Sequence, residues 1–277
     1  MFATNKAFAF IVLTPLLYLL LRRFVNFVEP TILIYMSRKR IVVLSGAGIS
    51  VESGIAPFRG TGGLWNNEDL ARLATITAWQ ERPAEVLEFY NQRRTYLGEV
   101  QPNSAHLLLA RMERDYDVAI ITQNVDDLHE RAGSSNIIHL HGELTKVRPE
   151  GTYNKQDGFC EDEVTDIGYS EIHLGDTGGK FHRQLRPHIV FFGEPVPKIE
   201  EAQCEVVGAD IILVVGTSLQ VYPAAGLCYY APENCEIYVI DPAKPETHSG
   251  RPVHYITEKA TAGMEEFARL IGFDLSK

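Results

Sequence analysis

The sequence predicts an α/β protein, namely a Rossmann-like, doubly wound parallel sheet with a smaller inserted module. From residue 40 onward, short apolar runs rich in β-branched residues alternate with segments of helical character. Strands that alternate with helices form βαβ units, which build a mostly parallel sheet with helices on both faces. Residues 143–186 break the alternation because they are polar, with glycine and aspartate scattered through them. Such a segment indicates a loop-rich module.

Each predicted strand is a short apolar run, as expected of strands buried on both faces of a parallel sheet. In chain order the runs are RIVVL (40–44), DVAII (117–121), NIIHL (136–140), HIVFF (188–192), DIILVVG (210–216) and EIYVI (236–240). The helix predicted at 83–98 opens with Pro83 and closes with Gly98, residue types common at helix ends. The other predicted helices span 103–116, 126–133, 198–208, a short segment from Pro223, and 263–272.

Two segments leave the alternating pattern at strand ends, the module at about 143–186 and a mostly helical insertion at about 54–100. An open α/β sheet has its ligand crevice at strand ends. We therefore expect both segments to border a binding site.

The chain has 277 residues and a formal net charge of −10. This length suits one large or two small domains. The acidic balance disfavours a nucleic-acid surface, so we expect no nucleic-acid partner. No two cysteines form a C-x-x-C pair, which favours a reducing, cytoplasmic compartment over a disulfide framework. A monomer is the working expectation, although the sequence does not name the oligomeric state.

Residues 1–35 are expected to be an apolar extension or anchor that precedes a domain spanning 36–277. The apolar run at 7–21 is shorter than the roughly 20 residues of a spanning helix, and Pro15 interrupts it. Five basic residues follow the run, and they would keep the remaining chain in the cytoplasm if the run inserts. Met36 supports the alternative of a dispensable extension. Membrane contact is expected only through residues 7–21.

The segment SGAGISVESGIAPFRG follows the first predicted strand. Gly46 and Gly48 fit a turn at which main-chain N–H groups and a helix N-terminus meet a phosphate. The dinucleotide fingerprint is incomplete, because Val51 stands where a third glycine is usual. Phe58 could cover a reactive ring, and Arg59 could bind phosphate. The alternative is a plain strand-to-helix turn.

The stretch TQNVDDLH at 122–129 follows the apolar run DVAII. It brings Gln123, Asn124 and Asp126 to a strand end, where amide and carboxylate groups can recognise a carboxamide ligand. The alternative is that Asn124 and Asp126 cap the helix that follows.

Two further strand ends carry polar groups. His139 and His141 alternate along HLHGE, so they point to opposite sides, and one can act as a general base while the other packs. Gly216, Thr217 and Ser218 end a very apolar strand and could hold phosphate or ribose. The alternatives are a structural histidine pair and another simple turn.

Together, GAGIS…SGI…FRG, TQNVDDLH, HLHGE, RPHIVFFGE and GTSLQVYP stand in an order and spacing that resembles the sirtuin family of NAD-dependent protein lysine deacylases, over about residues 38–272. The resemblance implies an NAD cofactor, acylated-lysine protein substrates, and the products nicotinamide, free lysine and O-acyl-ADP-ribose. It implies catalytic roles for His141 as the base and for Asn124 and Asp126. The implied NAD-binding residues are Gly46, Ala47, Gly48, Phe58, Arg59, Gln123, Asn124, Asp126, Gly216, Thr217, Ser218, Asp241 and Ala260. The implied peptide-binding residues are Val190, Phe192, Gly193 and Val221, which would take the substrate as an added strand.

The acyl preference is predicted from EFYNQRR. Tyr90 and Arg93 are three residues apart and share a helix face. The pair resembles the Y-x-x-R signature of bacterial class III members that prefer succinyl- or malonyl-lysine. A phenol and a guanidinium can together hold the distal carboxylate of such a chain. The alternative is a solvated arginine on an amphipathic helix.

The sequence departs from the family at the metal site. Sirtuins usually carry four zinc-binding cysteines in the small module, whereas residues 143–186 contain only Cys160, with His173 and His182 nearby. We therefore predict no structural zinc. Asp241 stands where relatives often have asparagine. The functional alternatives are a protein ADP-ribosyltransferase, a non-catalytic NAD-binding sensor and a hydride-transfer dehydrogenase, the last disfavoured by the missing third glycine.

Overall fold

A computed structural model describes residues 38–57, 72–151, 153–154, 158–159, 163–247 and 249–276. The chain divides into two units, Met1–Arg38 and Lys39–Lys277, and every element named below belongs to the second. The predictions made for residues 1–35, Phe58, Arg59 and Cys160 lie outside the described residues. No helix in the described part of the chain is long and apolar enough to cross a membrane.

The main sheet has six parallel strands in the order β12-β11-β10-β1-β2-β3. The chain enters it at the centre, adds strands on one side, and then returns to build the other side. This order is that of a doubly wound dinucleotide-binding sheet, and it confirms the predicted fold class. The strands are β1 (Arg40–Ser45), β2 (Asp117–Thr122), β3 (Ile137–His139), β10 (Ile211–Val215), β11 (Glu236–Ile240) and β12 (His254–Ile256).

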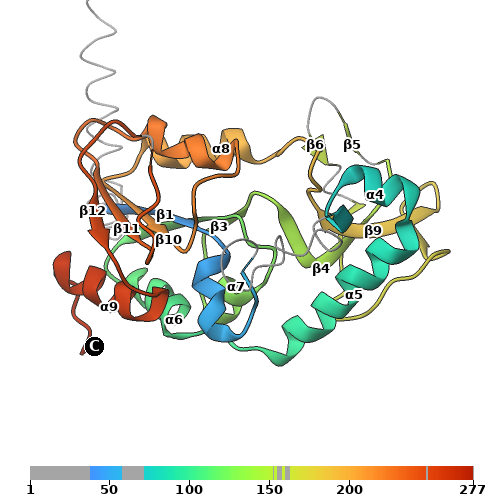
Figure 1. The fold of residues 1–277 in the computed structure, drawn as a ribbon, viewed down its shortest axis with the longest axis horizontal. Helices are drawn as coiled ribbons and strands as arrows, with labels where there is room; N and C mark the ends of the chain where they lie inside the picture. Colours follow the sequence, from blue (N-terminus) through green and yellow to red (C-terminus); the bar gives the residue numbers. More distant parts are fainter. Residues whose placement is uncertain are drawn as a thin grey trace, which may run out of the picture. The chain divides into compact units, whose positions relative to one another are not determined.

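Alternate side chains of β1 enter two separate buried clusters. Ile41 and Val43 pack with α6 (Ser104–Met112) and α9 (Ala260–Leu270). Val42 and Leu44 pack with α8 (Ile199–Val207) and η4 (Ala224–Tyr230). Figure 1 shows α8 on one side of the sheet and α6 and α9 on the other. A strand covered on both faces must be apolar at every position, which explains the continuous runs in the sequence.

Short helices leave the carboxyl ends of the first two strands. The 3-10 helix η1 (Ala47–Ser53) follows β1, and α7 (Leu128–Ala132) follows β2. The described part of the helical insertion consists of α4 (Ile76–Glu81) and α5 (Pro83–Glu99). Helix α5 begins at Pro83 as predicted, because proline needs no hydrogen-bond partner at a first helical position.

A second, antiparallel sheet has the order β7-β4-β9-β8. Its strands are β4 (Gly142–Pro149), β7 (Thr165–Asp166), β8 (Thr177–Gly178) and β9 (Arg183–Ile189), and β5 (Tyr153–Asn154) pairs separately with β6 (Gly158–Phe159). The prediction that a strand at 188–192 continues the parallel series is therefore wrong: the strand ends at Ile189 and pairs with β4. An apolar run shows that a strand is buried but does not identify its partner.

A third buried cluster joins this second sheet to the helical insertion. It contains Trp79 of α4, Tyr90 of α5, Leu144 and Val147 of β4, and Phe191. The cluster places α5 directly against β4 and the end of β9.

The turn after β1 and the turn after β10 touch. The Gly46 and Gly48 N–H groups donate to the carbonyls of Val215 and Gly216 at 3.1 and 2.8 Å. Gly216 has a φ of +61°, and a Cβ atom there would lie 2.2 Å from the main-chain nitrogen of Ile49. Glycine is required at position 216 for its conformation and for the space it leaves.

Replacing Gly216 by alanine should therefore lower the free energy of unfolding by about 3 kcal/mol or more, since strain and a main-chain clash add. Gly250→Ala is the matched control, because Gly250 has a similar φ of +67° with nothing within 4 Å of the added Cβ. It should cost only about 1 kcal/mol, the usual penalty for that conformation. Urea unfolding of both variants measures the difference, and equal losses would show that the close approach does not matter.

Candidate functional site

The loops that follow β1, β2 and β10 meet at the carboxyl edge of the main sheet. Gln123 links all three, because its N–H donates to the carbonyl of Ser45 at 2.9 Å and its Nε2 donates to Thr217 Oγ1 at 2.9 Å. The strand order reverses between β1 and β10, so the loops meet at the topological switch point where such sheets bind ligands.

Ser50 connects the carboxylate of Asp126 and the amide of Asn124, both in the loop after β2. Its hydroxyl donates to Asp126 Oδ2 at 3.0 Å and lies 3.2 Å from Asn124 Nδ2, which also donates to the Gly46 carbonyl at 3.2 Å. Asn124 and Asp126 are both buried. Ser50 was missed at the level of sequence, although it stands in the same glycine-rich turn as Gly46 and Gly48.

Asp126 has two roles in this geometry. Its Oδ1 accepts the N–H of Leu128 at 3.2 Å, as a residue before a helix often does. Burial raises the pKa of its carboxyl group to about 6, against the opposing effect of the Leu128 and Ser50 hydrogen bonds. A buried carboxyl group of this kind binds polar donors tightly, because leaving it unpaired is costly.

The two histidines of HLHGE each hold a carbonyl of the same loop. His141 Nδ1 lies 2.9 Å from the Gln123 oxygen, and His139 Nδ1 lies 3.1 Å from the Asn124 oxygen. A carbonyl only accepts hydrogen bonds, so each Nδ1 carries a hydrogen. Burial lowers the pKa of His141, and the Gln123 carbonyl opposes this shift. His141 is therefore neutral at pH 7, and its Nε2 is a proton acceptor.

The remaining predicted cofactor residues are spread over the same edge. Ala47 is half-buried in η1, Ser218 is exposed after β10, and Ala260 is buried at the start of α9. Asp241 follows β11, and its Oδ1 accepts the N–H of Ala243 at 2.7 Å. The Gly46 and Gly48 N–H groups are used inside the protein, so these glycines serve the close contact of two turns in this structure.

The predicted peptide-binding residues lie on two loops. The Val190 N–H donates to the His141 carbonyl at 2.9 Å, which places this loop beside the histidine. Phe192 already pairs with Ala74 and Ile76 through both of its main-chain groups, so an added strand must use other main-chain groups here. Gly193 is exposed with a φ of +94°, and Val221 is half-buried.

Tyr90 and Arg93 lie together on α5. Tyr90 is 5% exposed, and its ring contacts those of Phe89 and Phe191 at 5.0 and 5.7 Å between centroids. Burial raises the pKa of its hydroxyl, and the charge of Arg93 opposes the shift. The Arg93 guanidinium lies 3.5 Å from the centre of the Phe89 ring and donates to the Phe89 carbonyl at 3.3 Å.

Behind Tyr90 lies a buried ion pair that the sequence did not indicate. Arg186 donates to both carboxylate oxygens of Glu194, at 2.7 and 2.8 Å, and Glu194 also accepts the N–H of Phe191 at 2.8 Å. The Arg186 guanidinium lies 4.1 Å from the centre of the Phe191 ring. This bidentate pair fixes the loop that carries Phe191 and Phe192.

Residues 46–223 match the Sir2 family. The chain is 48% identical over 235 residues to an NAD-dependent protein deacylase of Bacteroides thetaiotaomicron, covering 84% of this chain and 98% of that protein. It is 49% identical over 228 residues to an NAD-dependent protein deacylase of Helicobacter pylori, covering 82% of this chain and 95% of that protein.

Solved structures agree with the sequence comparison. A Sir2 homologue in complex with NAD is 36% identical with a TM-score of 0.73, covering 88% of this chain and 94% of that one. A Sir2 complex with a p53 peptide and NAD⁺ is 27% identical with a TM-score of 0.68, covering 88% of this chain and 98% of that one. On the matched motifs, the strand order and these relatives, the chain belongs to the Sir2 family.

Proposed function

We propose that this chain is an NAD-dependent protein lysine deacylase that prefers succinyl- and malonyl-lysine and retains some deacetylase activity. Two NAD-dependent protein deacylases are 48% and 49% identical to it over more than four fifths of the chain. A similar structure that holds a p53 peptide together with NAD⁺ supports a peptide as the second substrate. The single observation that carries the acyl preference is that the Arg93 cation beside Tyr90 has no carboxylate at ion-pair distance among the residues that the structure describes.

The site residues fit NAD chemically. A carboxamide donates hydrogen bonds through its NH2 group and accepts them through its oxygen. The carboxylate of Asp126 can accept, the amide of Asn124 can donate and accept, and both side chains are buried. Bound NAD would supply the ribose that accepts the acyl group, with nicotinamide as the leaving group. On this proposal Gln123 and Thr217 bind the ribose of NAD. Gly46, Gly48 and Gly216 allow the turns after β1 and β10 to approach each other closely.

His141 is proposed as the general base. Its Nδ1 hydrogen is fixed on the Gln123 carbonyl, so its Nε2 lone pair is available to take a proton from a ribose hydroxyl. Its lowered pKa keeps the ring unprotonated at neutral pH. The Val190 contact to the His141 carbonyl sets the proposed peptide loop beside this base.

The acyl preference rests on Arg93. Within the described residues no carboxylate lies at ion-pair distance from its guanidinium, whose contacts are the ring and carbonyl of Phe89. A half-buried cation without an anionic partner is costly, and a carboxylate on the acyl chain would remove that cost. Tyr90 next to it offers a hydroxyl donor on the same helix face.

A cytoplasmic location is also proposed. Three of the four cysteines, Cys204, Cys228 and Cys235, are free thiols, and free thiols are usual in reducing compartments.

Arg93→Met should raise KM for a succinyl-lysine peptide about tenfold or more and leave acetyl-lysine hydrolysis nearly unchanged. A lost charge-assisted hydrogen bond of roughly 1.5–3 kcal/mol corresponds to about 10–100-fold. Mass spectrometry of matched acetyl-, malonyl- and succinyl-peptides with NAD measures this. Arg82→Met is the control, since Arg82 sits at the exposed start of the same helix and pairs with Glu85. Desuccinylation no faster than deacetylation, and insensitive to Arg93→Met, would refute the preference.

His141→Ala should keep NAD binding and lower kcat by at least about a hundredfold, because a general base contributes on that scale. Calorimetry with NAD and single-turnover kinetics separate the two effects. In the unmodified protein, kcat/KM should fall on the acid side only below the ordinary histidine pKa of about 6.5, since burial lowers the pKa of His141. If label from NAD instead stays on protein, the chain is an ADP-ribosyltransferase.

A further inference from the structure

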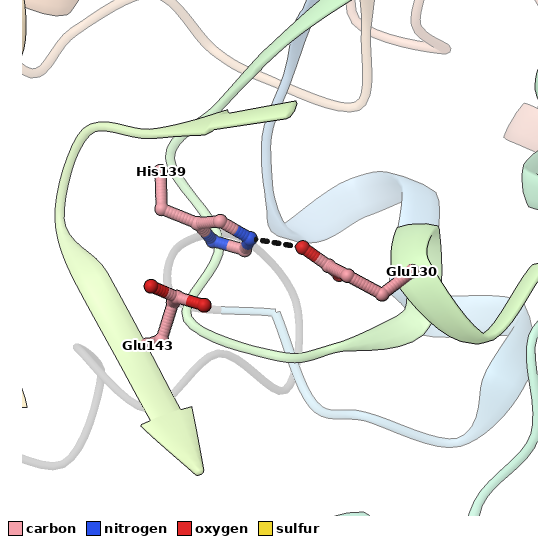
Figure 2. Close-up of side chains that lie close together, drawn as sticks. All are labelled: Glu130, His139 and Glu143. Atoms are coloured by element: carbon pink, nitrogen blue, oxygen red, sulfur yellow. Dashed lines mark hydrogen bonds and ion pairs between the residues drawn. The ribbon is translucent and has the colours of Figure 1, made fainter. Parts of the chain in front are cut away.

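His139 has an acceptor at each ring nitrogen. Its Nδ1 lies 3.1 Å from the Asn124 carbonyl, and its Nε2 lies 2.6 Å from Glu130 Oε1 (Figure 2). Neither a carbonyl nor an ionised carboxylate donates a hydrogen bond, so both ring nitrogens must carry a hydrogen. With an ionised Glu130 the geometry requires an imidazolium ring, and the His139 residue is 6% exposed.

The surroundings of the ring favour this charge. Burial opposes it, but the hydrogen bond and charge of Glu130, the charge of Glu143 and the Asn124 carbonyl together raise the pKa of His139. His141, two residues along the chain, has a lowered pKa. The strand end thus carries one charged and one neutral histidine.

The ring borders a cavity of about 290 Å³ between the main sheet and the second sheet. The titratable groups that line it besides His139 are Asp126 and Asp127 of the loop after β2, Glu130 of α7, Glu143 and Lys146 of β4, Asp166 of β7, and Tyr169 of the loop after β7. Carboxylates outnumber the cations, so a protonated His139 is the charge this cavity favours. Lys146 Nζ lies 2.7 Å from Glu143 and neutralises that carboxylate in part.

A metal ion is the other cation that such a group could hold. Ligand atoms of Glu130, His139 and Glu143 all lie within 4.8 Å of one another. However, the 2.6 Å between His139 and Glu130 is a hydrogen-bond distance. Two ligands of a tetrahedral zinc ion with bonds near 2.0 Å lie about 3.3 Å apart. The separation in this structure is that of two atoms that share a proton.

We propose that His139 and Glu130 form a charged pair that positions the loop carrying Asn124 and Asp126 for the deacylation reaction. This inference rests on the proposed function. His141 holds the loop at the Gln123 carbonyl, and His139 holds it at the next carbonyl. Asn124 and Asp126 depend on that main-chain placement, because their side chains reach Ser50 only from it. His139 acts through Asn124 and is a positioning residue.

The pair gives turnover an alkaline limit. A raised pKa means that the imidazolium is fully present below the ordinary value of about 6.5 and is lost as pH rises through the raised value. The neutral ring keeps one hydrogen for two acceptors, so either Asn124 or Glu130 loses its bond. Below that pH the loop is held at both carbonyls.

The test compares kcat and KM from pH 6 to 10 for the unmodified chain, Glu130→Gln and His139→Gln with an acyl-peptide and NAD. Glu130→Gln should move the alkaline limb to lower pH and lower kcat about tenfold at pH 8, because the groups that meet the substrates lose their alignment. His139→Gln should lower kcat and abolish the alkaline limb of its pH profile. KM for the peptide should change little in either variant.

Glu265→Gln is the matched control, because it removes one exposed carboxylate that pairs with Arg269 on α9. It should leave the pH profile unchanged. Nitrogen-15 NMR of the histidine rings adds a readout independent of activity and of variant folding. At pH 7 both ring nitrogens of His139 should be protonated, whereas only one of the two ring nitrogens of His141 should be protonated.

A neutral His139 ring at pH 7, or a Glu130→Gln profile identical to that of the unmodified chain, would overturn the positioning role. Inactivity of the unmodified chain on every acyl-peptide would instead refute the proposed function. In that case the ring spectrum still decides whether the charged pair exists.

Discussion

The site depends on how main-chain groups are satisfied where parallel strands leave the sheet. Beyond its last ladder bond each strand end has polar groups that must find partners, and in this fold they find them in neighbouring loops. Gly48 pairs with Gly216, Gly216 pairs with Ile240, and Gln123 pairs with Ser45. These bonds draw the loops after β1, β2 and β10 into contact. The side chains on those loops then have little freedom in where they point.

The same rule extends to side chains that hold main-chain oxygens. The carbonyls of Gln123 and Asn124 are both bound by histidines from the end of β3. The two rings make the same kind of contact through Nδ1, and His139 has a further partner at Nε2. Burial lowers the pKa of both rings, but at His139 the hydrogen bond and charge of Glu130, helped by Glu143 and the Asn124 carbonyl, outweigh it. His139 is the last residue of β3 and His141 lies in the turn that follows, so one short segment offers both a charged ring and a neutral base.

The sequence predicted the parallel sheet well and the second sheet poorly, for one reason. A strand covered on both faces is continuously apolar, so β1, β2, β10 and β11 could be recognised without knowing their neighbours. Strand β4 carries Lys146 and Arg148 and buries Leu144 and Val147, so its pattern depends on a partner far along the chain. The 3-residue edge strand β12 also escaped prediction.

The site residues also divide into those that the local sequence predicts and those that depend on distant partners. The glycine turn and the loop TQNVDD carry their signal locally, in residue types that are unusual after an apolar strand. Ser50 binds Asp126 from 76 positions away, and Glu130 contacts His139, nine positions along. Arg186 and Glu194 read as ordinary surface charges until the fold buries them. The roles of these residues depend on contacts with distant parts of the chain, so the neighbouring sequence does not predict them.

Arg94 shows how the second sheet controls the proposed acyl pocket. It is fully buried, and burial lowers its pKa to about 10. Its guanidinium donates to the carbonyl of Leu144 at 2.7 Å and to that of Ser170 at 3.3 Å, so it ties α5 to two segments of the module. A helix held at one side chain cannot rotate about its axis, and neighbouring residues lie about 100° apart around that axis. Fixing Arg94 therefore fixes the directions of Arg93 and Tyr90, and a pocket built on α5 is only as well defined as the sheet that anchors it.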